Sequence, residues 1–415
     1  MKTRVLYDKR KSVYLFILVF VTYALIYMTK NCFSAAMASI VEADVMSKSD
    51  TGLIASMFYV FYAPFQIVGG IYVDRYSPYK LIFIGMIGAG ILNLLIYFIE
   101  GYVAMLIIWS LNGIVQFGVW PGIFKIVTTE IMPEHRSSGL TYIHMAYTAG
   151  LAVSYLSAAF ISDWKNNFLF SAVILFILAV VFLSVYKLLS RYMTEEEAGT
   201  ADVKKVEYES IPLRKKIAVI IKAGIPLVMI ISTIHSLLNL GIKALFPVML
   251  MESYEGINAS LANILNILLI VAGPIGLLAS HTSFFKRIAP TKSLSLLFAL
   301  SLPLLAVVCF IGSVPAVFAI AATSIIMAFT GAMSLMFSNI ARGFEKYNCV
   351  GTLVGTINCM SALGILISNY AFSMIAEAKG WQFTAICWLA VASFAFILTL
   401  ITIPLWSRFR KKNCN

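Results

Sequence analysis

The sequence predicts an all-α membrane protein in which twelve transmembrane helices form two pseudo-symmetric halves of six. The 415-residue chain is 60% hydrophobic and only 12% charged, whereas about 25% of the residues in soluble domains are charged. A transmembrane helix needs about 20 mainly apolar residues to cross a hydrocarbon core of about 30 Å. The twelve stretches that meet this requirement are 12–40, 50–73, 79–99, 102–130, 137–161, 167–190, 216–250, 258–281, 290–312, 315–341, 349–375 and 381–406.

One long polar stretch, 191–216, divides these segments into six and six. Transporters built from two parallel repeats have this layout and hold their substrate between the halves, near the membrane midplane. A sensor or a channel could also have many spans, but the even division favours a transporter. We therefore expect an N-terminal bundle over 1–190, a cytoplasmic linker over 191–216 and a C-terminal bundle over 217–415.

The distribution of positive charge predicts the orientation of the chain. The net charge is +12, and with both termini inside, 25 of the 31 Lys and Arg residues fall at cytoplasmic positions. This is the positive-inside pattern of membrane proteins, so we expect no nucleic-acid partner. We expect a multi-pass protein of the plasma membrane, here a bacterial inner membrane, with both termini cytoplasmic and the bilayer as its surroundings.

The first apolar stretch carries one lysine far from either end. Lys30 lies ten residues before Ile40, or about 15 Å along a helix. A lysine near the bilayer centre costs about 2.5–3.5 kcal/mol, so another interaction must offset that cost. Tyr23, Tyr27 and Lys30 are spaced by four and three and share one helix face. We interpret this face as the wall of a polar cavity.

Two further lysines, Lys125 and Lys243, lie within predicted spans, and no acidic residue lies in the middle of a span. Three such cations without a protein counter-ion predict a positive site that an anion completes. For Lys30 and Lys243 the alternative is snorkelling or pairing with backbone carbonyls. Lys125 lies only five residues from Glu130, so a structural or gating role fits it equally well.

Two histidines, His144 and His235, also fall within predicted spans. A histidine in a helix is commonly a hydrogen-bonded packing residue. Its pKa near neutrality also allows it to handle a proton or contact a substrate. Both interpretations stay open for each histidine.

A basic turn follows the second apolar segment and reads Gly70-x-x-x-Asp74-Arg75-x-x-x-x-Lys80. The loop after the eighth segment repeats the glycine and the distal base at the same spacing but has no acid. We interpret Asp74 as a residue at a helix end that pairs with nearby charges in one gating state. The alternative is an ordinary basic cytoplasmic turn.

Motifs for enzymatic chemistry are missing from the sequence. We find no glycine loop with a lysine that would cradle phosphate, no metal-ligand cluster and no pair of nucleophile and base. The six cysteines are scattered without paired spacing. We therefore expect no enzyme, no cofactor and no metal, and a monomer that binds a small anionic substrate.

Several of these residues carry a resemblance to a known family. The turn from Gly70 to Lys80 resembles the signature loop of the major facilitator superfamily, which implies the major facilitator fold. Within it, the chain resembles the organophosphate:phosphate antiporters, the group of the glycerol-3-phosphate and hexose-phosphate transporters. The residues that carry this second resemblance are Tyr23, Tyr27, Lys30, Phe33, Ala36 and Met37 in the first segment, Tyr62 in the second, and Gly118, Val119, Trp120 and Pro121 in the fourth.

The chain departs from that group in its cations. The resemblance implies arginines where Lys30 and Asn239 stand, with Lys243 one turn further along the same face. Gln66 replaces an expected lysine. Arginine binds phosphate through two parallel hydrogen bonds, whereas lysine is a point charge, so a carboxylate substrate becomes nearly as favoured as an organophosphate. The expected substrate-binding residues are Lys30, Lys243, Tyr23, Tyr27, Tyr62, Lys125, Trp120, Asn239, His144 and Tyr147, and the expected gating residues are Gly70, Asp74, Arg75 and Lys80.

These features together predict a secondary active transporter that moves a small organic anion by alternating access. Exchange is the favoured mode, because a proton symporter usually carries an intramembrane carboxylate. One alternative is a proton-coupled organic-anion symporter. Another is an anion sensor of the same fold that does not transport. Export of cationic drugs fits poorly, because a positive cavity would repel them.

Overall fold

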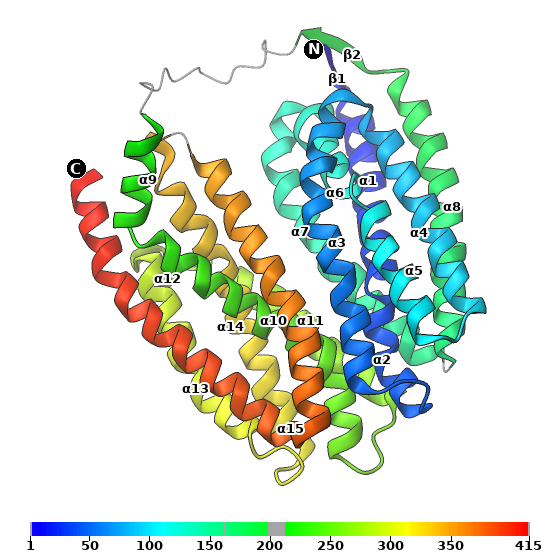
Figure 1. The fold of residues 1–415 in the computed structure, drawn as a ribbon. Coiled ribbons are helices and arrows are strands. Elements are labelled where there is room, and N and C mark those ends of the chain that lie inside the picture. Colours follow the sequence, from blue (N-terminus) through cyan, green and yellow to red (C-terminus); the bar gives the residue numbers. More distant parts are fainter. Residues whose placement is uncertain (1, 162, 198–211, 348, 414–415) are drawn as a thin grey trace. The chain divides into compact units, whose positions relative to one another are not determined.

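The computed structural model describes residues 2–161, 163–197, 212–347 and 349–413 (Figure 1). Its helices lie on all twelve predicted apolar segments, which confirms the predicted fold class. Among the described residues, nine segments are long and apolar enough to cross a membrane, and one of these, Leu353–Lys411, has 59 residues. Long runs of apolar residues form helices here because a helix satisfies its own backbone hydrogen bonds, which lipid cannot do.

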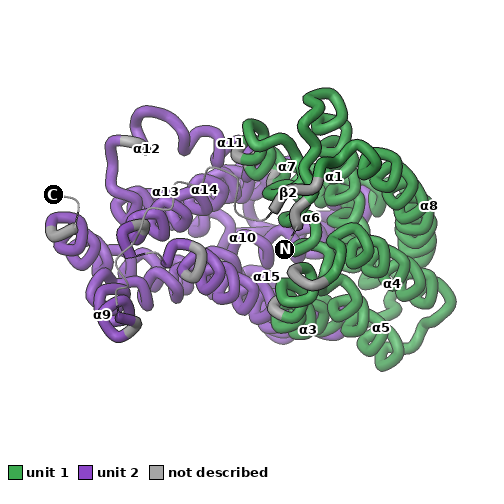
Figure 2. Tube along the Cα trace, turned by 90° about the horizontal axis from the view of Figure 1, so that it is seen from above, with its two compact units in different colours: residues 1–46, 53–204 green, residues 47–52, 205–415 purple. Residues whose placement is uncertain are grey.

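The chain forms two compact units (Figure 2). Unit 1 comprises Met1–Met46 and Leu53–Lys204, and unit 2 comprises Ser47–Gly52 and Lys205–Asn415. The division at 204 falls inside the polar stretch 191–216. The predicted bundle limits themselves stay predictions.

Unit 1 holds two short strands and the first eight α-helices. A π-helix, η1, follows α6 directly. The bounds are β1 Lys2–Val5, α1 Lys9–Lys30, α2 Cys32–Glu42, α3 Lys48–Arg75, α4 Pro78–Phe98, α5 Tyr102–Val115, α6 Val119–Lys125, η1 Ile126–Glu130, α7 Pro133–Phe160, α8 Trp164–Ser190 and β2 Thr194–Glu197.

Unit 2 holds the remaining helices, of which α15 is the longest described. The bounds are α9 Leu213–Lys222, α10 Ile225–Ser253, α11 Ala259–Ala279, α12 Ser283–Arg287, α13 Pro290–Val308, α14 Ala316–Arg342, the 3-10 helix η2 Glu345–Tyr347, and α15 Val350–Asn413.

The first apolar segment is two helices rather than the single helix that we inferred from its length. It breaks at Asn31, whose φ of −100° and ψ of 2° are not helical. The Asn31 side-chain amide donates to the Tyr27 carbonyl over 2.8 Å and so satisfies one of the acceptors freed by the break. Lys30 is therefore the last residue of α1. A cation is favoured there, because the carbonyl end of a helix is negative.

Other segments are also interrupted. The fourth splits into α5, α6 and η1, and the seventh begins with a separate helix, α9, before a turn at Gly224. The last two segments form one continuous run, α15, whose backbone leaves the helical conformation at Gly380, where φ is 81°. Glycine suits both turns because it has no Cβ to clash at positive φ.

A small antiparallel sheet joins two segments that are far apart in the chain. β1 pairs with β2, placing Lys2 opposite Glu197 and Arg4 opposite Glu195. Opposite charges across neighbouring strands stabilise such a pair. Beyond β1, the Leu6 amide donates to the Glu130 carbonyl over 2.9 Å. The sheet is an addition to the all-α prediction and ties the start of the linker to the N-terminal arm.

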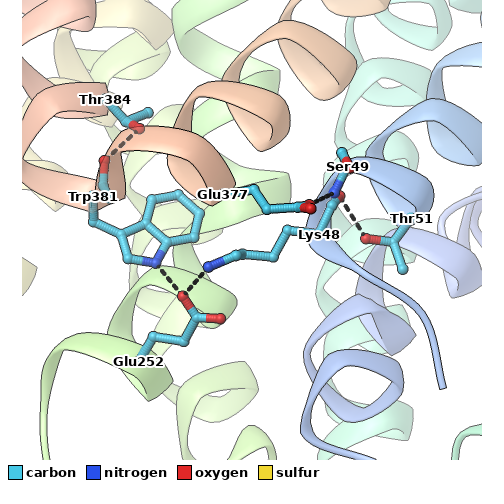
Figure 3. Close-up of polar contacts among 8 residues, drawn as sticks. Lys48, Ser49, Thr51, Glu252, Glu377, Trp381 and Thr384 are labelled. Atoms are coloured by element: carbon cyan, nitrogen blue, oxygen red, sulfur yellow. Dashed lines mark hydrogen bonds and ion pairs between the residues drawn. The ribbon is translucent and has the colours of Figure 1, made fainter. Parts of the chain in front are cut away.

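The first turn of α3 belongs to unit 2, although the rest of α3 lies in unit 1. Figure 3 shows how it is held. The Lys48 ammonium lies 2.7 Å from a Glu252 carboxylate oxygen that also accepts a 2.7 Å hydrogen bond from the Trp381 indole. The Ser49 amide donates to Glu377 over 2.8 Å. We call these five residues the α3 anchor.

Close helix contacts occur at two of the small residues in the predicted small-residue repeats. A Cβ at Gly150 in α7 would lie 2.1 Å from the Ala24 carbonyl oxygen of α1, and one at Gly276 in α11 would lie 1.7 Å from the Ala328 oxygen of α14. Small residues at such positions allow helix backbones to approach closely in lipid.

Candidate functional site

Lys30 is buried in unit 1, with only 5% of its surface exposed, and aromatic rings surround its ammonium group. The Nζ atom lies 3.4 Å from the ring centroid of Tyr62 and 5.0 Å from that of Tyr27. The corresponding distances to Phe58 and Tyr59 are 5.1 and 5.5 Å. We call these four rings the Lys30 cage.

The sequence builds this cage by simple spacing. Tyr27 lies one turn before Lys30 on α1, and the other three rings come from one stretch of α3, at positions i, i+1 and i+4. A cation over a desolvated aromatic ring gains up to about 2 kcal/mol. No carboxylate in the described ranges lies within ion-pair distance of Lys30. The rings and the carbonyl end of α1 therefore offset the burial of this charge.

The aromatic contacts continue from the cage to other predicted site residues. The Tyr23 ring lies 5.1 Å from Trp120 and 5.0 Å from Tyr27, and Tyr27 lies 4.6 Å from Tyr147. Unit 1 thus brings together six of the residues that we expected to bind substrate. They are Tyr23, Tyr27, Lys30, Tyr62, Trp120 and Tyr147. The side chain of His144 lies outside the described part of the structure.

Lys125 makes a different contact from Lys30. Its ammonium group donates a hydrogen bond to the backbone carbonyl of Val73 in the last turn of α3. Its neighbour Glu130 is buried and accepts a 2.7 Å hydrogen bond from the Tyr186 hydroxyl of α8. This geometry favours the structural or gating interpretation of Lys125 over substrate binding.

The proposed gating turn lies between α3 and α4. Gly70 is half-buried in α3, where an added Cβ would meet no atom within 4 Å, and Lys80 is exposed at the start of α4. The side chains of Asp74 and Arg75 lie outside the described set. Their gating role therefore stays a prediction.

Lys243 is buried in unit 2, in the middle of α10, with 6% of its surface exposed. Its Nζ atom donates a 2.7 Å hydrogen bond to the Asn239 side-chain oxygen, one turn earlier on the same helix. The Thr330 hydroxyl of α14 lies 3.2 Å from that same oxygen. The two residues that occupy the region of the expected second arginine are therefore bonded to each other.

A polar cavity of about 190 Å³ lies entirely within unit 2, among α10, α14 and α15. Asn239 and His235 line it from α10, Asn358 lines it from α15, and Phe337 is among its apolar members. Five serines complete the polar lining, namely Ser232, Ser236, Ser334, Ser338 and Ser361. We call this space the serine cavity.

Our sequence reasoning did not identify the serine cavity. The signal was present in the spacing, because two serines lie four residues apart on α10 and two more lie four apart on α14. This spacing places each pair on one helix face. Small residues with this repeat also mark ordinary helix packing, so the pattern alone does not separate the two roles.

The chain was compared with known proteins. The family model described as "Major Facilitator Superfamily" matches residues 19–369. "Membrane sensor protein UhpC" of Escherichia coli strain K12 is 33% identical over 131 residues, 32% of this chain and 30% of that protein. A "Probable hexose phosphate transport protein" of Chlamydia pneumoniae is 24% identical over 37% of this chain and 33% of its own length. The "Hexuronate transporter" of Bacillus subtilis strain 168 is 28% identical over 45% of each chain.

These matches therefore span less than half of the length of each curated relative. Likeness in structure extends further. The inward-facing, unoccupied crystal structure of a bacterial homologue of the human lysosomal transporter Spinster superposes with a TM-score of 0.77 at 15% identity. That superposition covers 97% of this chain and 99% of the other, and it shows that the fold is shared.

Proposed function

The chain belongs to the major facilitator superfamily, whose members are membrane transporters rather than enzymes, and we propose that it exchanges small organic anions across the membrane. The observation that carries this proposal is Lys30. It is a buried cation that aromatic rings hold in place and that has no carboxylate partner in the described ranges. An anion would supply the charge that the protein does not.

The anion in this proposal is an organophosphate or a carboxylate. The relatives support both classes, since the names of two of them refer to a hexose phosphate and to a hexuronate. Lys30 binds either class as a point charge, because a lysine cannot form the paired hydrogen bonds that arginine makes to phosphate. Tyr23, Tyr27, Tyr62, Trp120 and Tyr147 would wall the site in unit 1.

Asn239 and Lys243 are the proposed contribution of unit 2, and His144 stays in the proposed set by its position in the sequence. Gly70, Asp74, Arg75 and Lys80 are proposed to control the change between access states. Lys125 would support them through its hydrogen bond to Val73, three residues after Gly70.

Counterflow in proteoliposomes tests the proposed function. Vesicles that contain the purified protein would be preloaded with one unlabelled anion and diluted into the same anion in labelled form. The panel comprises inorganic phosphate, glycerol 3-phosphate, glucose 6-phosphate, glucuronate and gluconate. We expect saturable counterflow with at least one organic anion and none with choline. Empty liposomes are the control, and failure of every anion would refute the proposal.

A sensor without transport is the second candidate, because one relative is named a membrane sensor protein. A sensor would bind the anion but would not move it. Saturable binding to the purified protein, measured by thermal stabilisation, together with no counterflow of the same anion would favour this alternative.

A further inference from the structure

We propose that the serine cavity binds the hydroxyl groups of the transported anion, so that the substrate is a polyhydroxylated acid or phosphate ester rather than a simple acid. This inference rests on the proposed function and specifies its substrate. It assigns the cavity a task that the anionic group of the substrate does not explain, because none of the described residues that line the cavity carries a fixed charge.

The donor and acceptor pattern of the lining suits hydroxyl groups. A ring nitrogen of His235, Nε2, lies 2.8 Å from the Thr330 carbonyl oxygen. A carbonyl only accepts, so Nε2 carries the proton and Nδ1 of the neutral ring is an acceptor. The Asn239 oxygen already accepts from Lys243, which leaves the amide group of Asn239 as a donor. A hydroxyl both donates and accepts, and could bond to both side chains.

Ser236 provides an independent observation. It is buried, with 6% of its surface exposed, and it lines the serine cavity. Its hydroxyl has no hydrogen-bond partner among the described residues. A buried hydroxyl left unpaired costs free energy, and a ligand hydroxyl or a water molecule in the cavity would remove that cost.

Two other serines show how the cavity is pre-arranged. The Ser232 hydroxyl of α10 lies 2.7 Å from the Ser361 hydroxyl of α15, so only one of the two protons is used between them. The remaining proton and lone pairs are available to a ligand. The volume of about 190 Å³ corresponds to several water molecules at about 30 Å³ each, which is room for more than one hydroxyl group.

The test uses ligands that differ only in their hydroxyl groups. Gluconate and hexanoate share a carboxylate and six carbons, and glycerol 3-phosphate and propyl phosphate share a phosphate and three carbons. Binding of all four to the purified protein would be measured by thermal stabilisation, and each would compete for counterflow. We expect the hydroxylated member of at least one pair to bind about tenfold more tightly or better.

Variants connect that preference to the cavity. Ser236→Ala should weaken binding of the hydroxylated ligand by about three- to tenfold and leave its hydroxyl-free partner unchanged. The control is Ser301→Ala, which removes a buried hydroxyl of α13 that bonds to the Leu297 carbonyl of the same helix and does not line the serine cavity. If Ser236→Ala does not fold, Ser361→Ala tests the same subsite.

The outcomes separate this inference from the proposed function. Counterflow with equal binding of both members of each pair would overturn the inference and leave anion exchange standing. Selective binding of the hydroxylated ligand without any counterflow would overturn exchange and leave the inference standing. Equal effects of Ser236→Ala on both members of a pair, or binding of none of the four ligands, would also overturn the inference.

Discussion

At the scale of single residues, the central feature is a lysine whose charge is balanced by rings. The Lys30 cage places the π-faces and edges of four aromatic residues around one ammonium group. Rings lower the cost of burying the charge without neutralising it, so the charge stays available to an anion. A carboxylate in the same place would form an ion pair and compete with the substrate.

Removing the charge should therefore remove anion binding. We expect Lys30→Gln to weaken the affinity for the best counterflow anion by about 30-fold or more, since loss of one partner of a buried charge pair costs about 2–5 kcal/mol. Competition binding measures the change. Lys125→Gln is the matched control, because Lys125 bonds to a backbone carbonyl. An affinity of Lys30→Gln within twofold of the wild type would exclude Lys30 from the site.

The rings can be tested separately from the charge. Tyr62→Leu removes the nearest ring face, whereas Tyr62→Phe keeps it. We expect Tyr62→Leu to lower the melting temperature of the ligand-free protein and to be partly rescued by bound anion, because the anion then compensates the charge of Lys30. Tyr62→Phe should behave like the wild type in this respect. Equal melting temperatures for both variants would show that the ring does not stabilise the ammonium group.

At the scale of elements, the position of the cage depends on how closely α1 packs against α7. The contact at Gly150 lies beside Tyr27, whose Cβ would be 2.8 Å from an added methyl group. Overpacking of such a contact costs about 1–3 kcal/mol. The helix that carries Tyr23, Tyr27 and Lys30 is thus positioned by a residue that does not touch the cation.

We expect Gly150→Ala to reduce the free energy of unfolding by about 1–3 kcal/mol and to weaken anion binding by displacing α1. Gly355→Ala is the control, since nothing lies within 4 Å of the added methyl group and alanine favours a helix over glycine. Unfolding in denaturant and competition binding measure the two effects. If both substitutions leave stability unchanged, the α1–α7 contact is not tight.

The α3 anchor leads to a prediction at the same scale. Glu252→Gln removes the charge that Lys48 contacts and keeps an oxygen that can accept from Trp381. We expect faster amide hydrogen exchange in residues 48–53 and little change in global stability, because partly exposed ion pairs contribute about 0–1 kcal/mol. Glu100→Gln, which removes the partner of Lys165 in unit 1, is the control. Unchanged exchange at 48–53 would show that the carboxylate does not hold the turn.

At the scale of the whole molecule, the proposed exchange follows from the cost of an empty basic site. An unpaired buried cation is costly to enclose in a medium of low dielectric, and a bound anion offsets that cost. We expect uptake into proteoliposomes to depend strongly on an anion inside the vesicle and only weakly on an imposed pH gradient. Robust uptake into empty vesicles, driven by inward acid and abolished by replacing His144 or His235, would establish proton coupling instead.

Hydropathy predicted the twelve segments because lipid demands long apolar runs. It did not predict the breaks at Asn31 and Gly380, since one residue hardly changes the average over a window. The helical period brought Tyr23, Tyr27 and Lys30 together correctly. The pairing of β1 with β2 joins residues at the start of the chain to residues beyond the sixth apolar segment, and no local pattern encodes such a contact.

The site was predicted less completely than the fold. Phe58 and Tyr59 complete the Lys30 cage, but aromatic residues are frequent in this chain, which has 29 Phe and 20 Tyr, so their spacing alone did not distinguish them. Lys125 illustrates the opposite case. Its charge made it a candidate, and only the position of the Val73 carbonyl showed a different contact.

The α3 anchor also determines how this protein would behave if it were cut in two. A break in the peptide chain between residues 197 and 212 would leave Ser47–Gly52 on the N-terminal fragment, while their partners Glu252, Glu377 and Trp381 would be on the C-terminal fragment. The two fragments, expressed as separate chains, would then each carry one side of a polar recognition surface. Reassembly of the halves would be directed by a helix end that the first fragment lends to the second.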